Sequence, residues 1–341
     1  MKVLKVLLLG LVSLVVVLVV LGLFLPSSAQ VERSTVIEAP PATIFALVNN
    51  YQRFNDWSPW ADRDPDAVYE YSGPPQGVGA QMAWSGGPAV GTGSQEITLS
   101  EPYERIETAL DFGDQGTADA YFTFEPTGEG ATQVVWGFGT EFGWNLASRY
   151  FGLVMDGMLG GDYEEGLANL KQLAESLPDA DWTRLELERV EVEPQPVIQI
   201  GGSSAADATA VAAAYGQAFG TLMSTLGELE IEAAGSPLVF HTSWDETGYV
   251  FDAALPVAEP VELPADSPVS AGTVPGGPAL RVVHVGPYEQ LEDTYGLLDA
   301  YVEVHGLTVA GRPWDEFIDD PASTPADALR TLVYQPIESG G

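Results

Sequence analysis

Two carboxylates and a tryptophan lie next to one another in the segment GRPWDEF, at Trp314, Asp315 and Glu316. The segment is predicted to be a short strand, in which successive side chains point to opposite faces. Trp314 and Glu316 therefore share one face, and Asp315 lies on the other. A carboxylate beside a large aromatic ring on a covered face is suited to binding a cation or to general acid–base chemistry. The alternative is a Glu at the edge of a groove or on the surface, without such a role.

Three further residues are candidates for the same site. Tyr334, in the later strand LRTLVYQPI, supplies a phenol that can act with a carboxylate as an acid–base pair. Asp252, in the strand YVFDAALPV, is a second carboxylate candidate, and Trp244 is an aromatic candidate for ligand contact. The catalytic candidates are therefore Glu316, Asp252 and Tyr334, and the ligand-binding candidates in this part of the chain are Trp314, Glu316, Tyr334 and Trp244.

The composition excludes several other chemistries. The chain of 341 residues has no Cys and three scattered His, so we expect no thiol nucleophile, no dedicated metal site and no cofactor. The formal net charge is −36, from 49 acidic and 13 basic residues. Nucleic-acid binding requires clustered Lys and Arg, so we expect no nucleic-acid partner. The acidic surface is either that of an ordinary soluble protein or one suited to a saline habitat.

Residues 1–30 form a candidate membrane anchor. Lys2 and Lys5 precede a charge-free run from Val6 to Leu25, which is long enough to cross a bilayer as a helix of about 20 residues. Lys on that flank favours a cytoplasmic N-terminus, which puts the remaining chain outside the cytoplasm, in the periplasm or extracellular space. The following PSSAQ is similar to a signal-cleavage site, so a cleaved signal sequence is the alternative to a single-pass anchor in the cell membrane.

Residues 31–178 are predicted to form the first soluble domain of an α+β protein. A strand and a helix that begins with Pro are followed by short alternating segments separated by Gly and Pro, which is typical of an antiparallel meander. Apolar residues then recur at helical spacing from Leu146 to Leu177 and predict a long closing helix, which Gly160 and Gly161 are expected to bend or interrupt. This helix-grip arrangement leaves an apolar cavity between helix and sheet.

The segments NNYQRFNDWSPWADRDP, YSGPPQGVGAQMAWSG, GATQVVWGF and DGMLGGDYEEGLANLKQLAE resemble the polyketide cyclase/dehydrase branch of the SRPBCC (START-like) superfamily. The resemblance implies a cavity for a hydrophobic ligand but no single reaction, because the superfamily combines carriers, sensors and enzymes. The tryptophans of this domain either line the cavity or pack as core and turn residues. The ligand-binding candidates among them are Trp57, Trp60, Trp84 and Trp136.

Residues 183–338 are predicted to form a second domain from two repeats, about 183–257 and 279–338. Each repeat has the order strand, helix, strand, strand, and a Pro/Gly-rich connector separates them. At one constant offset the repeats coincide in helix and turn positions, for example Gly235 with Gly311 and Pro237 with Pro313. Two such units related by a pseudo-twofold axis would surround a central groove.

The motifs VVHVGPYEQLEDTYGLLDAYVEVHG, GRPWDEFIDDP and LRTLVYQPI resemble a GyrI-like effector-binding domain, the type attached to AraC- and MerR-class regulators. The resemblance implies an aromatic-lined groove for amphiphilic or cationic small molecules, and some members hydrolyse small electrophiles with an acid and a Tyr. No basic helix-turn-helix precedes this domain, which argues against a transcription factor. Leu332 replaces the acid that family members often carry in the last strand, and Asp252 has the equivalent position in the first repeat.

Three functions remain open from the sequence. The first is a membrane-anchored, extracytoplasmic and non-enzymatic protein that binds a small hydrophobic or amphiphilic ligand, because no coherent catalytic set is evident. The second is a hydrolase or a polyketide cyclase/dehydrase-like enzyme acting on a small hydrophobic substrate through the acid and Tyr groups of the second groove. The third is an interaction scaffold of the cell envelope.

Overall fold

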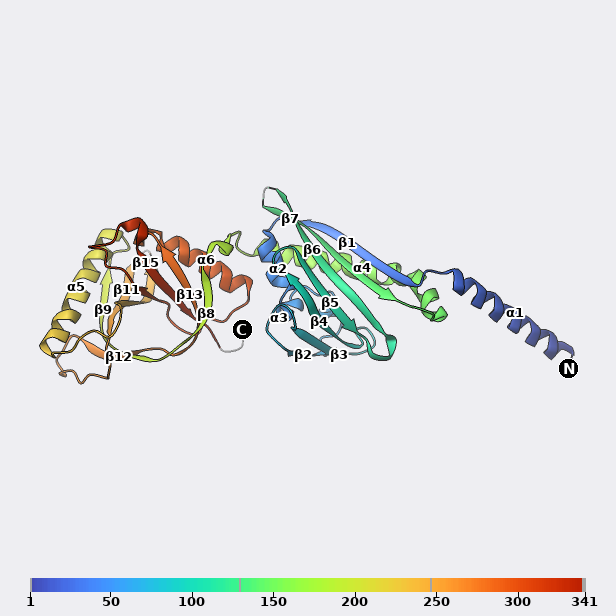
Figure 1. Cartoon of the computed structure of the whole chain (residues 1–341), viewed down its shortest axis with the longest axis horizontal. Helices are drawn as coiled ribbons and strands as arrows, with labels where there is room; N and C mark the ends of the chain where they lie inside the picture. The colour runs from blue at the N-terminus through green and yellow to red at the C-terminus, as the bar shows by residue number, and fades with distance from the viewer. Residues whose placement is uncertain (1, 129, 246, 339–341) are drawn as a thin grey trace. The chain divides into compact units, whose positions relative to one another are not determined.

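The computed structural model describes residues 2–128, 130–245 and 247–338 (Figure 1). The chain divides into two compact units, one up to Asp179 and the other from Ala180 onward. The fold is mixed α+β, with an N-terminal apolar helix and one antiparallel sheet in each unit. The second sheet is accompanied by a repeated strand–helix arrangement, so the fold class predicted from the sequence is confirmed.

The charge-free N-terminal run forms the helix α1 (Lys2–Phe24). Its residues from Leu7 to Phe24 have a mean hydropathy of 3.2, and almost none of them is buried. By length and composition this helix is able to cross a membrane, and a signal sequence has the same properties.

The first unit contains a seven-stranded antiparallel sheet in the order β1-β7-β6-β5-β4-β3-β2. Two short helices follow its first strand, and the earlier of them begins with Pro41. Pro is tolerated there, because an N–H group at the first helical position would have no hydrogen-bond partner within the helix. The elements are β1 (Ser28–Ile37), α2 (Pro41–Val48), α3 (Tyr51–Phe54), β2 (Val68–Ser72), β3 (Gln81–Ser85), β4 (Thr92–Glu101), β5 (Arg105–Asp111), β6 (Thr117–Gly128) and β7 (Ala131–Glu141).

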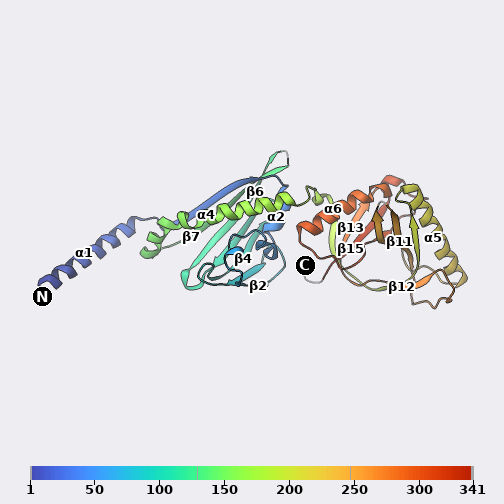
Figure 2. The ribbon, with the colours of Figure 1, turned by 180° about the vertical axis from the view of Figure 1, so that it is seen from behind.

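The long helix α4 (Leu146–Ser176) lies along this sheet beside β1 in both views (Figures 1 and 2). It is continuous through Gly160 and Gly161, so of the bend or interruption expected there, the interruption is wrong. Gly160 instead provides space for a neighbouring side chain, since a Cβ at this position would overlap Nη2 of Arg33. The glycine is explained by tertiary packing and not by the end of a helix.

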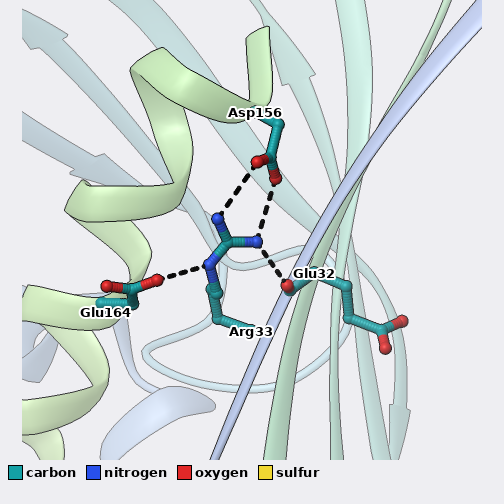
Figure 3. A network of polar contacts seen from close by, with 4 residues as sticks. All are labelled: Glu32, Arg33, Asp156 and Glu164. Atoms are coloured by element: carbon teal, nitrogen blue, oxygen red, sulfur yellow. Dashed lines mark hydrogen bonds and ion pairs between the residues drawn. The ribbon is translucent and has the colours of Figure 1, made fainter.

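Arg33 joins β1 to α4 (Figure 3). Its Nε donates to Glu164 at 2.7 Å, and its Nη1 and Nη2 donate to Asp156 at 3.0 and 3.3 Å. A fourth bond, the second from Nη1, reaches the backbone oxygen of Glu32 at 2.8 Å. These ion pairs are exposed to water and each contributes little to stability, but together they fix the position of the helix on the sheet.

The second unit contains an eight-stranded antiparallel sheet in the order β12-β9-β11-β10-β14-β15-β13-β8, with two helices. The elements are β8 (Leu187–Val192), β9 (Gln195–Ser204), α5 (Ala208–Glu228), β10 (Leu238–Asp245), β11 (Gly248–Pro256), β12 (Ser270–Val274), β13 (Gly277–Val285), α6 (Leu291–Val304), β14 (Trp314–Phe317) and β15 (Arg330–Pro336).

The order of this sheet is symmetric about the central pair β10 and β14. Val239 is paired with Asp315, and these two positions are equivalent in the two repeats, because each lies two residues after the shared Pro, Pro237 or Pro313. A pseudo-twofold axis therefore passes between them. One face of the sheet packs against α5 and α6, through core residues that include Leu222 and Leu298. The other face carries a separate apolar cluster that contains Leu238, Phe240, Trp314 and Tyr334.

Candidate ligand-binding site

A cavity of about 360 Å³ opens on the face of the second sheet that α5 and α6 do not cover. Its wall includes Leu238 from β10, Trp314 and Glu316 from β14, and Tyr334 from β15. Antiparallel pairing sets this arrangement, because Trp314 lies opposite Tyr334 and Glu316 lies opposite Leu238. The volume falls within the range of about 300–1,000 Å³ that is usual for small-molecule sites.

Trp314 and Tyr334 form the aromatic part of this wall. Their rings are stacked, with centroids 4.9 Å apart and planes 9° from parallel. Trp314 is 2% exposed and Tyr334 is 9% exposed, so the neighbouring strands hold both rings in place. The small part of each ring that borders the cavity offers apolar contact to a ligand without a large loss of side-chain entropy.

Glu316 gives the cavity a carboxylate beside these rings. Its Oε2 accepts a hydrogen bond from Tyr334 Oη at 3.1 Å. Burial, followed by the charge of Glu316, raises the pKa of the Tyr334 phenol, although Arg281 opposes that shift. Tyr334 therefore remains protonated at neutral pH and is able to donate a hydrogen bond.

The cavity wall is acidic in balance. Among the described residues that line it, Glu191, Glu193 and Glu316 carry carboxylates, whereas Arg281 is the one basic residue. Arg281 is itself paired, because its Nη2 donates to Glu188 Oε2 at 2.6 Å. The charge distribution consequently favours a positively charged or neutral ligand over an anion.

Asp252 and Trp244 lie outside this wall. The Asp252 carboxylate is paired with Arg312, with 2.7 Å between Oδ2 and Nη1. Arg312 also lies over the ring of Phe240, 5.8 Å from its centroid. Trp244 is 58% exposed near the far end of β10, and its ring contacts that of Tyr249 at 4.9 Å. Of the residues predicted for this groove, the structure thus brings Trp314, Glu316 and Tyr334 together.

Of the candidate tryptophans of the first unit, Trp57 and Trp136 belong to its packed interior, and Trp60 and Trp84 are partly buried against it. Trp57 and Trp136 are 1% and 3% exposed, and their ring centroids lie 5.5 Å apart. Trp136 also stacks on Tyr163 of α4 at 3.9 Å. Trp60 contacts the same cluster, while Trp84 packs against Phe112 at its margin. A ligand that reaches Trp57 or Trp136 therefore requires these rings to separate.

A polar network that we did not predict from the sequence lies on the helix-facing side of the second sheet. Asp315 is 2% exposed, and its Oδ2 lies 3.0 Å from His241 Nε2. Its Oδ1 accepts a hydrogen bond from Tyr295 Oη at 2.8 Å. Tyr249 Oη lies 2.8 Å from His241 Nδ1 and 2.7 Å from Tyr215 Oη.

This network connects the two repeats through hydrogen bonds. Burial raises the pKa values of Tyr215 and Tyr249, and burial together with the charge of Asp315 raises that of Tyr295 well above its ordinary range. The phenols therefore remain protonated and satisfy one another, the imidazole and the carboxylate. Because both oxygens of Asp315 are bonded within the network, we interpret it as a link between repeats and not as an open site.

The sequence did contain a signal for this network. Asp315 alternates with Glu316 and so points to the opposite face of its strand, and the repeat makes Val239 its equivalent. His241, two residues after Val239, shares that face. Pairing β10 with β14 across the pseudo-twofold axis would have predicted that His241 lies near Asp315.

Two family models match this chain. Residues 28–175 match the model for polyketide cyclase / dehydrase and lipid transport, and residues 186–338 match the model for a GyrI-like small molecule binding domain. The chain joins a polyketide-cyclase-type domain to a GyrI-like domain. Both resemblances predicted from the sequence are thus confirmed, and both families are families of small-molecule binders. The cavity with Trp314, Glu316 and Tyr334 lies in the GyrI-like domain.

Solved structures with some likeness to this chain share little sequence with it. A hydrolase encoded by lin2189 from Listeria innocua is 14% identical, and the match covers 45% of this chain and 91% of that protein, with a TM-score of 0.34. The C-terminal domain of EcmrR is 15% identical, with 46% and 99% covered and a TM-score of 0.37. EcmrR bound to DNA is 12% identical, with 63% and 88% covered and a TM-score of 0.40. A comparison with curated proteins found no match.

Proposed function

We propose that this protein binds small amphiphilic molecules and does so as a binding protein rather than as an enzyme. The observation that carries the proposal is the stacked pair Trp314–Tyr334 beside Glu316 in one cavity. The rings suit the apolar part of a ligand, and the carboxylate suits a positive charge. The acidic balance of the wall favours a cationic amphiphile in the GyrI-like domain.

The protein is proposed to be anchored in the cell membrane by α1, with both domains outside the cytoplasm. Lys2 and Lys5 at the start of the chain support a cytoplasmic N-terminus. The polyketide-cyclase-type domain is proposed to bind an apolar ligand against its tryptophans, which requires the packed rings of Trp57 and Trp136 to separate. A nucleic-acid partner is not part of the proposal, because a net charge of −36 repels phosphates.

Binding of a small organic cation to the full chain in lipid nanodiscs tests this function. We expect calorimetry to show binding of benzyltrimethylammonium and much weaker binding of phenylacetate, which has a ring and the opposite charge. The substitution Glu316→Gln should weaken binding of the cation by about tenfold, the equivalent of about 1.4 kcal/mol, because the charge is lost with little change in shape.

Asp252→Asn is the matched control, since Asp252 lies in the same sheet but outside the cavity wall and is paired with Arg312. Its affinity for benzyltrimethylammonium should equal that of the unchanged protein. Equal affinity of Glu316→Gln and the unchanged protein, or no binding of the cation at all, would contradict the proposed site.

A hydrolase is the second candidate function, and the bond from Tyr334 to Glu316 favours it. In such a reaction Glu316 takes a proton from the attacking water, and Tyr334 donates a proton to the oxygen whose bond to carbon breaks. Phenyl glycidyl ether, an epoxide that carries an aromatic ring, is a suitable probe, because its hydrolysis requires only the attack of water on carbon, cleavage of the C–O bond and these two proton transfers. Turnover that is lost in both Glu316→Gln and Tyr334→Phe would favour the enzyme, and turnover unchanged in both would exclude these residues.

A further inference from the structure

The N-terminal half of α4 exposes a series of large apolar side chains. Phe151, Leu153, Val154 and Met158 are 49%, 61%, 53% and 56% exposed. Trp144, just before the helix, is 84% exposed. Isolated apolar residues are common on protein surfaces, but several large ones within one short segment indicate an interaction surface.

The spacing of these residues places most of them on one side of the helix. Phe151, Val154 and Met158 are separated by three and four residues, so they form one stripe. Met155 and Gly160, which face the sheet, are buried. The stripe is therefore turned away from the domain to which α4 belongs.

Charge is also divided unevenly along α4. Residues 146–160 contain two charged side chains, Arg149 and Asp156, and both are bonded within the domain. Residues 161–176 contain five, which are Asp162, Glu164, Glu165, Lys171 and Glu175. Asp156, the exposed one of the two, lies about 200° around the helix from Val154 and from Met158, where it is paired with Arg33. In a chain with 49 acidic residues, the stripe itself therefore contains none of the charged side chains that normally keep such a surface in water.

Arg149 and Tyr150 attach this half of α4 to the end of α1. Arg149 is 9% exposed, and its Nη1 donates to the backbone oxygens of Leu25 and Leu23 at 3.1 and 3.4 Å. Tyr150 Oη donates to the backbone oxygen of Leu18 at 2.6 Å. Leu18 lies six residues before Phe24, which corresponds to about 9 Å along a helix. The contact is thus not limited to the last turn of α1, but continues back along the apolar helix to Leu18.

We propose that Trp144 and the stripe Phe151, Val154 and Met158 form a membrane-contact surface that lies in the interface of the bilayer crossed by α1. The inference rests on the proposed membrane anchoring. If α1 spans the bilayer and ends near Phe24, the bonds from Arg149 and Tyr150 hold the start of α4 at the depth of the headgroups. Amphipathic helices insert their apolar face about 5–10 Å into this region, and Trp is enriched there.

The absence of Cys from the sequence permits a direct test by single-site spin labelling of the full chain in nanodiscs. Val154→Cys and Met158→Cys probe the proposed surface. Gln172→Cys is the matched control, because it is exposed and lies a whole number of turns, about five, after Val154 on the same side of α4. Val12→Cys reports whether α1 is inserted.

We expect labels at 154 and 158 to be more accessible to oxygen, which concentrates in lipid, than to a water-soluble nickel complex. The label at 172 should show the reverse order. If position 12 lies in lipid while 154 and 158 are accessible to the nickel complex, the proposed membrane contact of α4 is contradicted and the proposed anchoring by α1 is retained. If position 12 is also open to water, the anchor itself fails. Spin–spin broadening at 154 would assign the stripe to a second copy of the chain and overturn the proposal.

Discussion

Asp315 occupies a position at which a carboxylate has two hydrogen-bond partners and almost no contact with water. Replacing Asp315 with Ala leaves the His241 imidazole and the Tyr295 phenol without their acceptor. We expect the free energy of unfolding of the GyrI-like domain to fall by about 3 kcal/mol, which is typical when one member of a buried network is removed. Urea denaturation would measure it, with hydrogen exchange of β14 assigning the transition to this domain.

Asp252→Asn serves as the comparison for that measurement. Its ion pair with Arg312 is partly exposed, with 26% and 46% of the two side chains accessible. Exposed pairs contribute at most about 1 kcal/mol, so the free energy of unfolding should change little. If Asp252→Asn lowers the free energy of unfolding as much as Asp315→Ala does, burial does not decide how much a carboxylate contributes to stability in this domain.

The buried tyrosines make the stability of the same domain depend on alkaline pH. The pKa of Tyr295 is raised well above its ordinary value of 10.0, because burial and the charge of Asp315 disfavour the phenolate. Well below pH 10 the phenol is neutral in both the folded and unfolded chains, so the contribution of this group to stability is constant. Above pH 10 the unfolded chain ionises first, so the free energy of unfolding falls, by up to about 1.4 kcal/mol per pH unit for each such group.

Tyr295→Phe isolates this contribution. The variant should be less stable at pH 8, because Asp315 loses a donor, yet its stability should decline less steeply between about pH 10 and 11. Urea midpoints at pH 8, 10 and 11 would compare the two proteins. Parallel declines in both proteins would contradict the assignment of this pH dependence to Tyr295.

Local sequence rules were sufficient for part of the candidate site. Alternation along a strand predicts that Trp314 and Glu316 share a face. Tyr334, which was also a candidate from the sequence, lies beside them because β15 pairs with β14. The position of Asp252 outside the cavity was harder to predict, because it depends on the ion pair with Arg312, a residue that is distant in the sequence. Trp244 shows the same limitation, because no local pattern indicates that its part of β10 extends beyond the cavity.

Among the elements, α4 shows most clearly that a tertiary contact can explain a glycine for which local rules predict a break in the helix. Gly161→Ala should raise the free energy of unfolding of the polyketide-cyclase-type domain by about 1 kcal/mol, because an added Cβ meets nothing within 4 Å and Ala favours the helix. Gly160→Ala should bring no such gain, since its Cβ would displace the Arg33 guanidinium. Urea denaturation of both variants provides the measurement, and equal stabilisation would contradict the role given to Gly160.

The elements themselves were largely predictable from periodicity. The internal repeat of the second domain and the long apolar helical pattern of the first predict the two-sheet α+β architecture that the structure has. The continuity of α4 was not predictable, because paired glycines normally weaken a helix and the compensating side chain, Arg33, lies far earlier in the chain, on β1. The buried network was missed for a similar reason, since it requires the pairing partner of β14.

For the molecule as a whole, the net charge of −36 predicts stabilisation by salt. Repulsion among 49 acidic residues disfavours the compact state, and added ions screen it, with a Debye length that falls to about 3 Å at 1 M. We expect the unfolding temperature of the full chain to rise between about 20 mM and 500 mM salt, equally in NaCl and KCl. A fall in that temperature, or an effect of only one salt, would show that screening is not the cause.

The pairing of Val239 with Asp315 across the pseudo-twofold axis has a consequence for the origin of the GyrI-like domain. In a homodimer of one repeat, a residue on the axis faces its own copy, so an acid there would confront a second acid in a dry interior. Apolar residues are the stable choice under that symmetry. Two repeats within one chain are not bound by that symmetry, and here one axial position is Val239 while the other is Asp315 with its own imidazole and phenol partners. The covalent linkage of the repeats therefore permits a single carboxylate at the axis, where an exact dimer would have to hold two carboxylates that share a proton.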